Sequence, residues 1–203
     1  MRAKKPFILY IKNKNFPKKV FYVKYTDDGI VLSTDNYVPS AYTTYYNREE
    51  QGRVVDYVIT MAYDEHINGS DGSGSVASIG FVKDAVQNVL KEVPAEKNII
   101  ALPFYARLWE ESSKGVSAKA YSMNNAKAIL DQNKAKTVWD DECQQYYAEY
   151  KSQGNMYRIW LEEEKSLEEK LKVVTENKVA GIAYWKLGLE RSSVWNVILK
   201  YLN

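Results

Sequence analysis

The fold is decided by the stretch VVDYVITMAY at residues 54–63, a short run rich in β-branched residues. Two later runs have the same character, NIIALPF at residues 98–104 and VAGIAYW at residues 179–185, and an earlier one reads GIVLSTDNYV at residues 29–38. They lack the polar–apolar alternation of a half-exposed strand, which is typical of strands buried on both faces of a parallel sheet. We therefore predict strands at all of these positions.

Helical patterns separate these strands. Apolar residues recur at helical spacing over residues 80–92. Residues 166–177 open with a predicted capping box between Ser166 and Glu169, and residues 192–202 form a final amphipathic pattern. The alternation of strands with helices predicts parallel β-α-β units and hence the α/β class.

Residues 110–165 have a different texture, because they are polar and rich in Tyr and Trp. We predict a mixed sub-domain here, with a helix at residues 122–132 and short strands at 138–139 and 156–161. Between those two strands we predict a polar helix that carries Cys143.

The chain has 203 residues, of which 45% are hydrophobic and 27% charged, and its net charge is +2. This balance is typical of one soluble globular domain. A single cysteine, Cys143, excludes an intramolecular disulfide and a cysteine zinc site, and a single histidine, His66, excludes a His-rich metal site. We interpret His66 as a polar loop residue and predict no metal and no cofactor. No apolar run approaches the ~20 residues of a membrane-spanning helix, and no signal peptide is expected at the start, so we predict no membrane partner.

The net charge hides an asymmetry. Residues 1–26 carry eight Lys or Arg and no acid, whereas the rest of the chain carries 20 bases against 26 acids. Interleaved aromatic residues make the basic segment a candidate for binding nucleic acid or an anionic wall polymer. No RNA-binding motif accompanies the charge, so we favour a solvated strand face or a poorly ordered terminus and predict no nucleic-acid partner.

Polar and aromatic side chains gather where the predicted strands end, which is where α/β barrels carry their sites. They are Asn36, Tyr37, Met61, Tyr63, Asp64, Tyr105, Arg107 and Trp185. Such a set suits a sugar, because aromatic rings cover the C–H face of a pyranose while carboxylates and amides bind its hydroxyls. Aromatic residues at strand ends also close hydrophobic cores, and the residues alone leave both interpretations open.

Several segments carry a resemblance to a known family. They are LSTDNYVPSAY at residues 32–42, MAYDEH at 61–66, ALPFYARLW at 101–109, VWDDECQQYYAEY at 138–150, YRIWLEEEKSLEEKL at 157–171 and GIAYWKLGLE at 181–190. In this order and spacing they resemble glycoside hydrolase family 18, in its chitinase-like branch of bacterial cell-wall and spore-lytic N-acetylglucosaminidases. Ala101 and Ala106 stand where many members have Gly.

The resemblance implies a partial (β/α)8 TIM barrel, strands five to eight, with a small α+β insertion domain before the last strand. Residues 29–109 and 166–203 would form the carboxyl-terminal half of the barrel, and 110–165 the insertion. Residues 1–28 are left as a basic amino-terminal segment of uncertain structure. A half barrel exposes two unpaired strand edges, so we expect self-association or a partner that supplies the missing half.

The resemblance also implies roles for individual residues in substrate-assisted hydrolysis. Tyr63 would hydrogen-bond the 2-acetamido carbonyl and orient it for attack, and Asp64 would hold the sugar or the acetamide region. The floor of the site would be formed by Met61 and Trp185. Binding of neighbouring sugar hydroxyls is implied for Tyr105 and Arg107, and more loosely for Asn36 and Tyr37.

One departure from the family pattern matters for activity. The D-x-x-D-x-D-x-E segment that ends in the general acid has no counterpart in the sequence. We expect Glu65 to point away from the face of Tyr63 and residues 162–164 to be a solvated charge run, so neither replaces it. The chain is then expected to be inactive alone on N-acetylglucosamine polymers of peptidoglycan, spore cortex or chitin. The alternative is a non-catalytic carbohydrate-binding or interaction module. Action at the cell envelope, the spore or outside the cell is expected from the resemblance.

Overall fold

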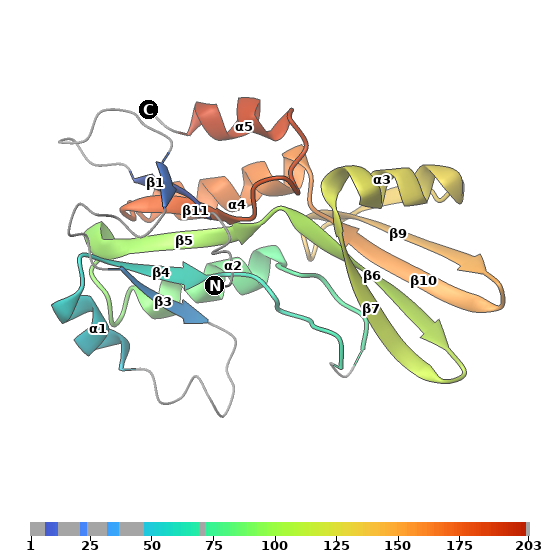
Figure 1. The fold of residues 1–203 in the computed structure, drawn as a ribbon, viewed down its shortest axis with the longest axis horizontal. Coiled ribbons are helices and arrows are strands. Elements are labelled where there is room, and N and C mark those ends of the chain that lie inside the picture. Colours follow the sequence, from blue (N-terminus) through green and yellow to red (C-terminus); the bar gives the residue numbers. More distant parts are fainter. Residues whose placement is uncertain (1–6, 12–20, 24–31, 37–46, 70–71, 202–203) are drawn as a thin grey trace, which may run out of the picture.

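The computed structural model describes residues 7–11, 21–23, 32–36, 47–69 and 72–201, which form two sheets joined end to end (Figure 1). The strands of the first sheet in spatial order are β2 (Phe21–Val23), β1 (Phe7–Ile11), β11 (Gly181–Trp185), β5 (Asn98–Pro103), β4 (Tyr57–Met61) and β3 (Leu32–Asn36). Those of the second sheet are β7 (Gly115–Ser122), β6 (Tyr105–Ser112), β10 (Asn155–Leu161), β9 (Gln145–Ser152) and β8 (Thr137–Asp140).

The four predicted strands β3, β4, β5 and β11 are neighbours and run parallel, so the α/β class is confirmed. Their registers bring Asn36 beside Met61 and Pro103 beside Trp185, so the carboxyl ends of the strands meet at one edge. The sheet is open, with β2 and β3 as its edge strands among the described residues. The mixed α/β arrangement is therefore established, while a closed barrel is not.

One expectation about the sheet edges is wrong. The outer edge of β11 is not unpaired, because β1 from the basic amino-terminal segment runs antiparallel along it, from Ile8 opposite Tyr184 to Ile11 opposite Gly181. The physical reason is that exposed strand edges present unpaired N–H and C=O groups, and an antiparallel strand satisfies them. Part of the basic segment is thus built into the first sheet.

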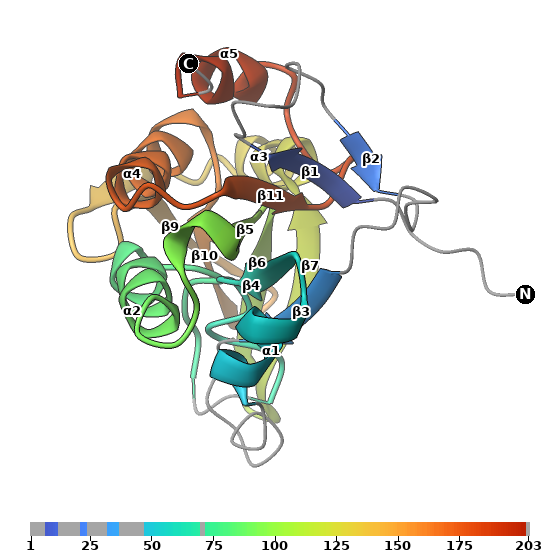
Figure 2. The same ribbon diagram turned by 90° about the vertical axis from the view of Figure 1, so that its left-hand side faces the viewer.

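Helices cover the first sheet (Figure 2). Helix α4 (Glu164–Glu176) contacts both α2 (Ile79–Val89) and α5 (Val194–Lys200), and α1 (Arg48–Val54) contacts β4. Phe104, just after β5, stacks on Tyr184 of β11 with 4.4 Å between ring centroids, and the ring of Trp195 meets it edge-on at 5.8 Å. These contacts bury the layer between sheet and helices. A short 3-10 turn, η2 (Ala95–Lys97), leads directly into β5.

The capping box of α4 lies three residues earlier than predicted. Glu163, not Ser166, is the N-cap, and its carboxylate accepts the amide of Ser166 at 2.9 Å. The hydroxyl of Ser166 accepts the amide of Glu163 at 3.0 Å in return. The roles are reversed relative to the Ser–Glu pattern because a carboxylate caps as well as a hydroxyl does.

The second sheet packs one face against α3 (Met123–Gln132), which begins after the predicted cap Ser122. The predicted helix around Cys143 is wrong, because residues 145–152 form strand β9 and Cys143 lies in the turn before it. Strand β9 pairs on both sides, with β8 and β10, which satisfies its backbone groups and suits its tyrosines. No helix in the described ranges is long and apolar enough to cross a membrane.

Candidate functional site

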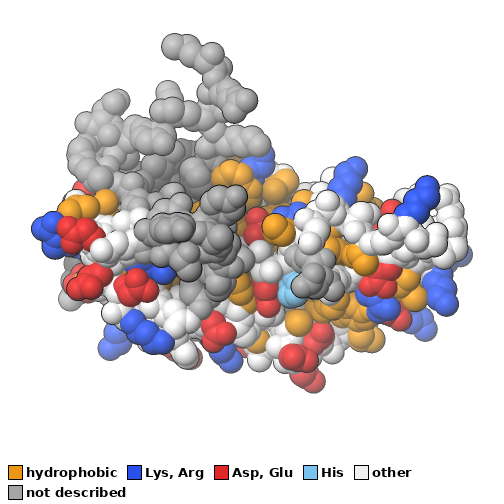
Figure 3. Space-filling model, turned by 90° about the horizontal axis from the view of Figure 1, so that it is seen from below, with side chains coloured by type: hydrophobic (Ala, Val, Ile, Leu, Met, Phe, Trp, Pro, Cys, Tyr) orange, Lys and Arg blue, Asp and Glu red, His pale blue; other side chains and the backbone are white. Residues whose placement is uncertain are grey.

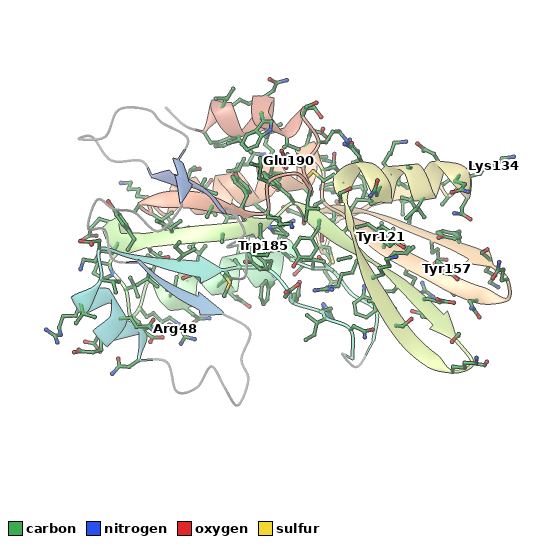
Figure 4. All side chains as sticks on the ribbon, viewed as in Figure 1. Arg48, Tyr121, Lys134, Tyr157, Trp185 and Glu190 are labelled. Atoms are coloured by element: carbon green, nitrogen blue, oxygen red, sulfur yellow. The ribbon has the colours of Figure 1, made fainter. Side chains whose placement is uncertain are left out.

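The site lies where the first sheet meets the second, and Figure 4 places Trp185 at this junction. Met61 ends β4 and Trp185 ends β11, and both side chains are half-buried against the core. Tyr105 and Arg107 do not belong to β5. Strand β5 ends at Pro103, and both residues start β6, two positions apart and therefore on one face of the second sheet. Both sheets thus contribute side chains to the site.

Asp64 is the centre of the cluster. Its Oδ1 accepts a hydrogen bond from Nη2 of Arg107 at 2.6 Å and another from the hydroxyl of Tyr105. Its backbone lies in the left-handed region, with φ 64°, which Asp tolerates better than most residues. Within the described parts of the chain, Oδ1 carries both bonds and nothing bonds to Oδ2. The other carboxylate oxygen, on a side chain that is 32% exposed, therefore has acceptor capacity that no described residue uses.

Tyr63 and Tyr105 form the buried aromatic part of the cluster. Their rings meet edge-on with 6.3 Å between centroids, and their exposed fractions are 7% and 5%. Burial raises the pKa of both phenols, and the charge of Asp64 raises each further. Both hydroxyls therefore stay protonated at physiological pH and serve as donors. Arg107 adds a cation 5.7 Å from the centre of the Tyr105 ring, and its buried Nε has no hydrogen-bond partner among the residues that the structure describes.

The remaining predicted site residues are only partly placed. Asn36 ends β3 with its backbone beside Met61. Tyr37 lies outside the described residues. Among the described residues, no three His, Cys, Asp or Glu side chains gather where they would hold a metal ion.

Glu65 and Glu162, two candidate replacements for a general acid, are both held in contacts within the protein. The carboxylate of Glu65 accepts the amide of Ser78 at 2.7 Å and its hydroxyl at 3.0 Å, at the start of α2. Glu162 is not solvated as expected, because its side chain is 0% exposed and pairs with Lys170 of α4. The sequence pattern missed this because three consecutive glutamates look like a solvent-facing run.

The loop after Asp64 is fixed to the second sheet, which sequence patterns did not indicate. The indole of buried Trp109 donates to the carbonyl of Gly74 at 2.7 Å. His66 packs its ring on the same glycine, where an added Cβ would lie 2.4 Å from the ring. Gly is therefore required at position 74 for this approach.

Charges are mixed on the described part of the face seen from below, where Lys or Arg side chains alternate with Asp or Glu (Figure 3).

With this geometry in view, comparison with known proteins decides the family. The family model for glycosyl hydrolases family 18 matches residues 19–190. The chain belongs to glycosyl hydrolase family 18. Its relatives include the cortical fragment-lytic enzyme of Bacillus subtilis, 31% identical over 155 residues that cover 75% of this chain and 36% of that protein. The B. subtilis glycosylase YvbX is 30% identical over 157 residues, covering 76% of this chain and 45% of that one.

Solved structures agree on the fold. The spore cortex-lytic enzyme SleL of Bacillus cereus has a TM-score of 0.76 at 23% identity, covering 85% of this chain and 41% of SleL. The chitinase of Chromobacterium violaceum has a TM-score of 0.75 at 21% identity, covering 84% and 55%. The sporulation-specific glycosylase YdhD of B. subtilis, 28% identical, has a TM-score of 0.70 and covers 79% and 54%. The matched residues span 36% of the B. subtilis cortical fragment-lytic enzyme and 45% of YvbX, which is less than half of each relative.

Proposed function

We propose that this chain binds a β-1,4-linked N-acetylglucosamine glycan through the cluster around Asp64, as part of a family 18 glycosidase site. The observation that carries the proposal is the state of the Asp64 carboxylate. Two donors hold one oxygen, and the other has no hydrogen-bond partner among the described residues. An acetamido group offers one N–H and one carbonyl, which match a free carboxylate oxygen and a protonated phenol.

In this proposal the free oxygen of Asp64 accepts the acetamido N–H, and the Tyr63 hydroxyl donates to the acetamido carbonyl. These two contacts turn the carbonyl oxygen toward the anomeric carbon. Its attack would form an oxazolinium ring only when a general acid from another segment protonates the glycosidic oxygen, which leaves with the electrons of the broken C–O bond. Burial keeps Tyr63 a donor by raising the pKa of its phenol. The half-buried Trp185 and Met61 supply the apolar floor for the pyranose.

We propose further that the chain alone does not hydrolyse the glycan. The sequence contains no D-x-x-D-x-D-x-E segment, and the carboxylates of Glu65 and Glu162 are held in structural contacts. Loss of a general acid lowers the rate by about 10²–10⁴-fold. A segment that supplies this acid, on another chain or in the remainder of a longer protein, would restore turnover. Self-association or pairing with such a segment stays part of this proposal.

The names of the relatives guide the choice of glycan. Two relatives are named cortical fragment-lytic and spore cortex-lytic enzymes. These names support peptidoglycan of the spore cortex, rather than chitin, as the glycan of this chain, and the spore or the cell envelope as its place of action. A barrel of strands five to eight with residues 110–165 as its insertion fits the order of the described strands.

The test measures cleavage and binding separately. Purified chain is incubated with a chromogenic N-acetylglucosamine oligomer, and binding of the unmodified oligomer is followed by calorimetry. We expect binding without turnover, and Tyr63→Phe should weaken binding while Tyr147→Phe, a tyrosine of β9 on the second sheet, should not. Turnover by wild-type chain that Tyr63→Phe abolishes contradicts the missing acid. Binding that ignores Tyr63→Phe contradicts the site.

A further inference from the structure

A chain of buried polar groups links helix α4 to the loop that follows Asp64. It starts with Lys170, whose ammonium contacts the carboxylate of Glu162, with side chains 1% and 0% exposed. Gln145 of β9 donates from Nε2 to Oε1 of Glu162 at 2.6 Å. The amide oxygen of Gln145 accepts the hydroxyl of Ser75, which lies in the loop between β4 and α2. Gln145 and Ser75 are also buried, so water does not compete for these groups.

The donor-to-acceptor direction of these linked hydrogen bonds is fixed at the end where Lys170 pairs with Glu162. The lysine makes the carboxylate of Glu162 an acceptor, so the Gln145 amide must turn its NH2 group toward it. That orientation presents the amide oxygen to Ser75, whose hydroxyl must donate. The oxygen of Ser75 in turn accepts the amide of Ala77 at 3.0 Å. The ion pair therefore determines where the Ser75 hydroxyl has to lie.

The segment held by Ser75 supports the two residues that follow Asp64. The amide of Glu65 donates to the carbonyl of Val76 at 2.9 Å. Nδ1 of His66 lies 3.1 Å from the carbonyl oxygen of Ser75. Because Asp64 holds an uncommon backbone conformation with φ 64°, its side chain direction depends on how its neighbours are anchored.

We propose that Gln145 is a positioning residue for Asp64, acting through Ser75 so that the second sheet sets the direction of the glycan-binding carboxylate. The inference rests on the proposed role of Asp64 in glycan binding. It predicts that substituting Gln145 in β9 alters the affinity for the glycan although Gln145 does not contact the glycan.

The test uses Ser75→Ala in the full chain, which removes the loop end of the polar chain and leaves the Glu162–Lys170 pair intact. The matched control is Ser193→Ala, which removes a serine-to-carboxylate contact with Glu164 that does not reach the loop. Amide exchange at Glu65 and chitotetraose affinity are measured for both. We expect Ser75→Ala to speed exchange at Glu65 and weaken binding about tenfold. Ser193→Ala should change neither.

A double-mutant cycle separates positioning from general stability. If Ser75 acts through Asp64, then Ser75→Ala added to Asp64→Asn weakens chitotetraose binding no further than Asp64→Asn alone. Losses that add overturn the inference, as does unchanged exchange at Glu65 in Ser75→Ala. If wild-type chain fails to bind chitotetraose, the proposed function falls, while the exchange measurement still decides whether Ser75 holds the segment. Gln145→Met provides the same readouts from the other side of the hydrogen bond.

Discussion

Lys170→Met should be among the most damaging single substitutions on α4, because it leaves a charge without its counter-ion inside the protein. Lys170 and Glu162 are 1% and 0% exposed, and after the change Glu162 keeps, among the described residues, only Gln145 and Ser166 as side-chain donors. Breaking one side of a buried ion pair costs about 3–5 kcal/mol. That is a large part of the about 5–15 kcal/mol that stabilises a typical domain.

The assay is urea unfolding followed by tryptophan fluorescence, with the free energy extrapolated linearly to water. Lys127→Met is the matched control, since it breaks a helical Lys–Asp pair whose side chains are 53% and 64% exposed and should cost below about 1 kcal/mol. Burial already raises the pKa of Glu162, so its protonation on acidification should reduce the loss in Lys170→Met. Equal losses for Lys170→Met and Lys127→Met, or a loss that grows as the pH falls, would refute the reasoning.

Three further predictions follow from the site and its surroundings. Asp64→Asn should lower the free energy of unfolding by about 1–2 kcal/mol, because it weakens the bonds from Arg107 and Tyr105. The control Asp131→Asn, at the exposed pair with Lys127, should lower it by at most about 0.5 kcal/mol. Equal urea midpoints for the two variants would contradict this prediction. Gly74→Ala should cost about 1–3 kcal/mol by collision with the His66 ring, and His66→Ala should relieve most of that loss in the double variant; an unrelieved loss places the collision elsewhere. Burial, with Asp140 adding to it, raises the pKa of the Cys143 thiol to about 12. Its reaction with a disulfide reagent at about pH 8 should therefore be roughly fiftyfold slower than in the unfolded chain, and similar rates would show an accessible thiolate.

The central strands of the first sheet could be predicted because both of their faces are buried. Strands such as β4 and β5 need apolar side chains on each face, and that requirement leaves a continuous apolar run in the sequence. Strand β9 could not be found in this way. Its sequence QYYAEYKS is polar, and it is a strand because β8 and β10 supply backbone partners on both sides. Those partners are set by tertiary structure.

The candidate site could likewise be predicted from the sequence only in part. Tyr63 and Asp64 could be placed together from the chain, because they follow the end of one parallel strand. The family resemblance added Tyr105 and Arg107, and the structure brings both onto Asp64. The contacts that hold this arrangement were not predictable, since the Gln145–Ser75 bond joins residues 70 positions apart in the sequence.

The central claim, that the Asp64 cluster recognises an acetamido group, is tested most directly by comparing two sugars. Chitotetraose and cellotetraose share their β-1,4-linked backbone, and only the first carries acetamido groups. Calorimetry on the full chain should show binding of chitotetraose, little or none of cellotetraose, and a loss of that preference in Asp64→Asn. Equal affinity for the two sugars, or a preference that survives Asp64→Asn, would contradict the account.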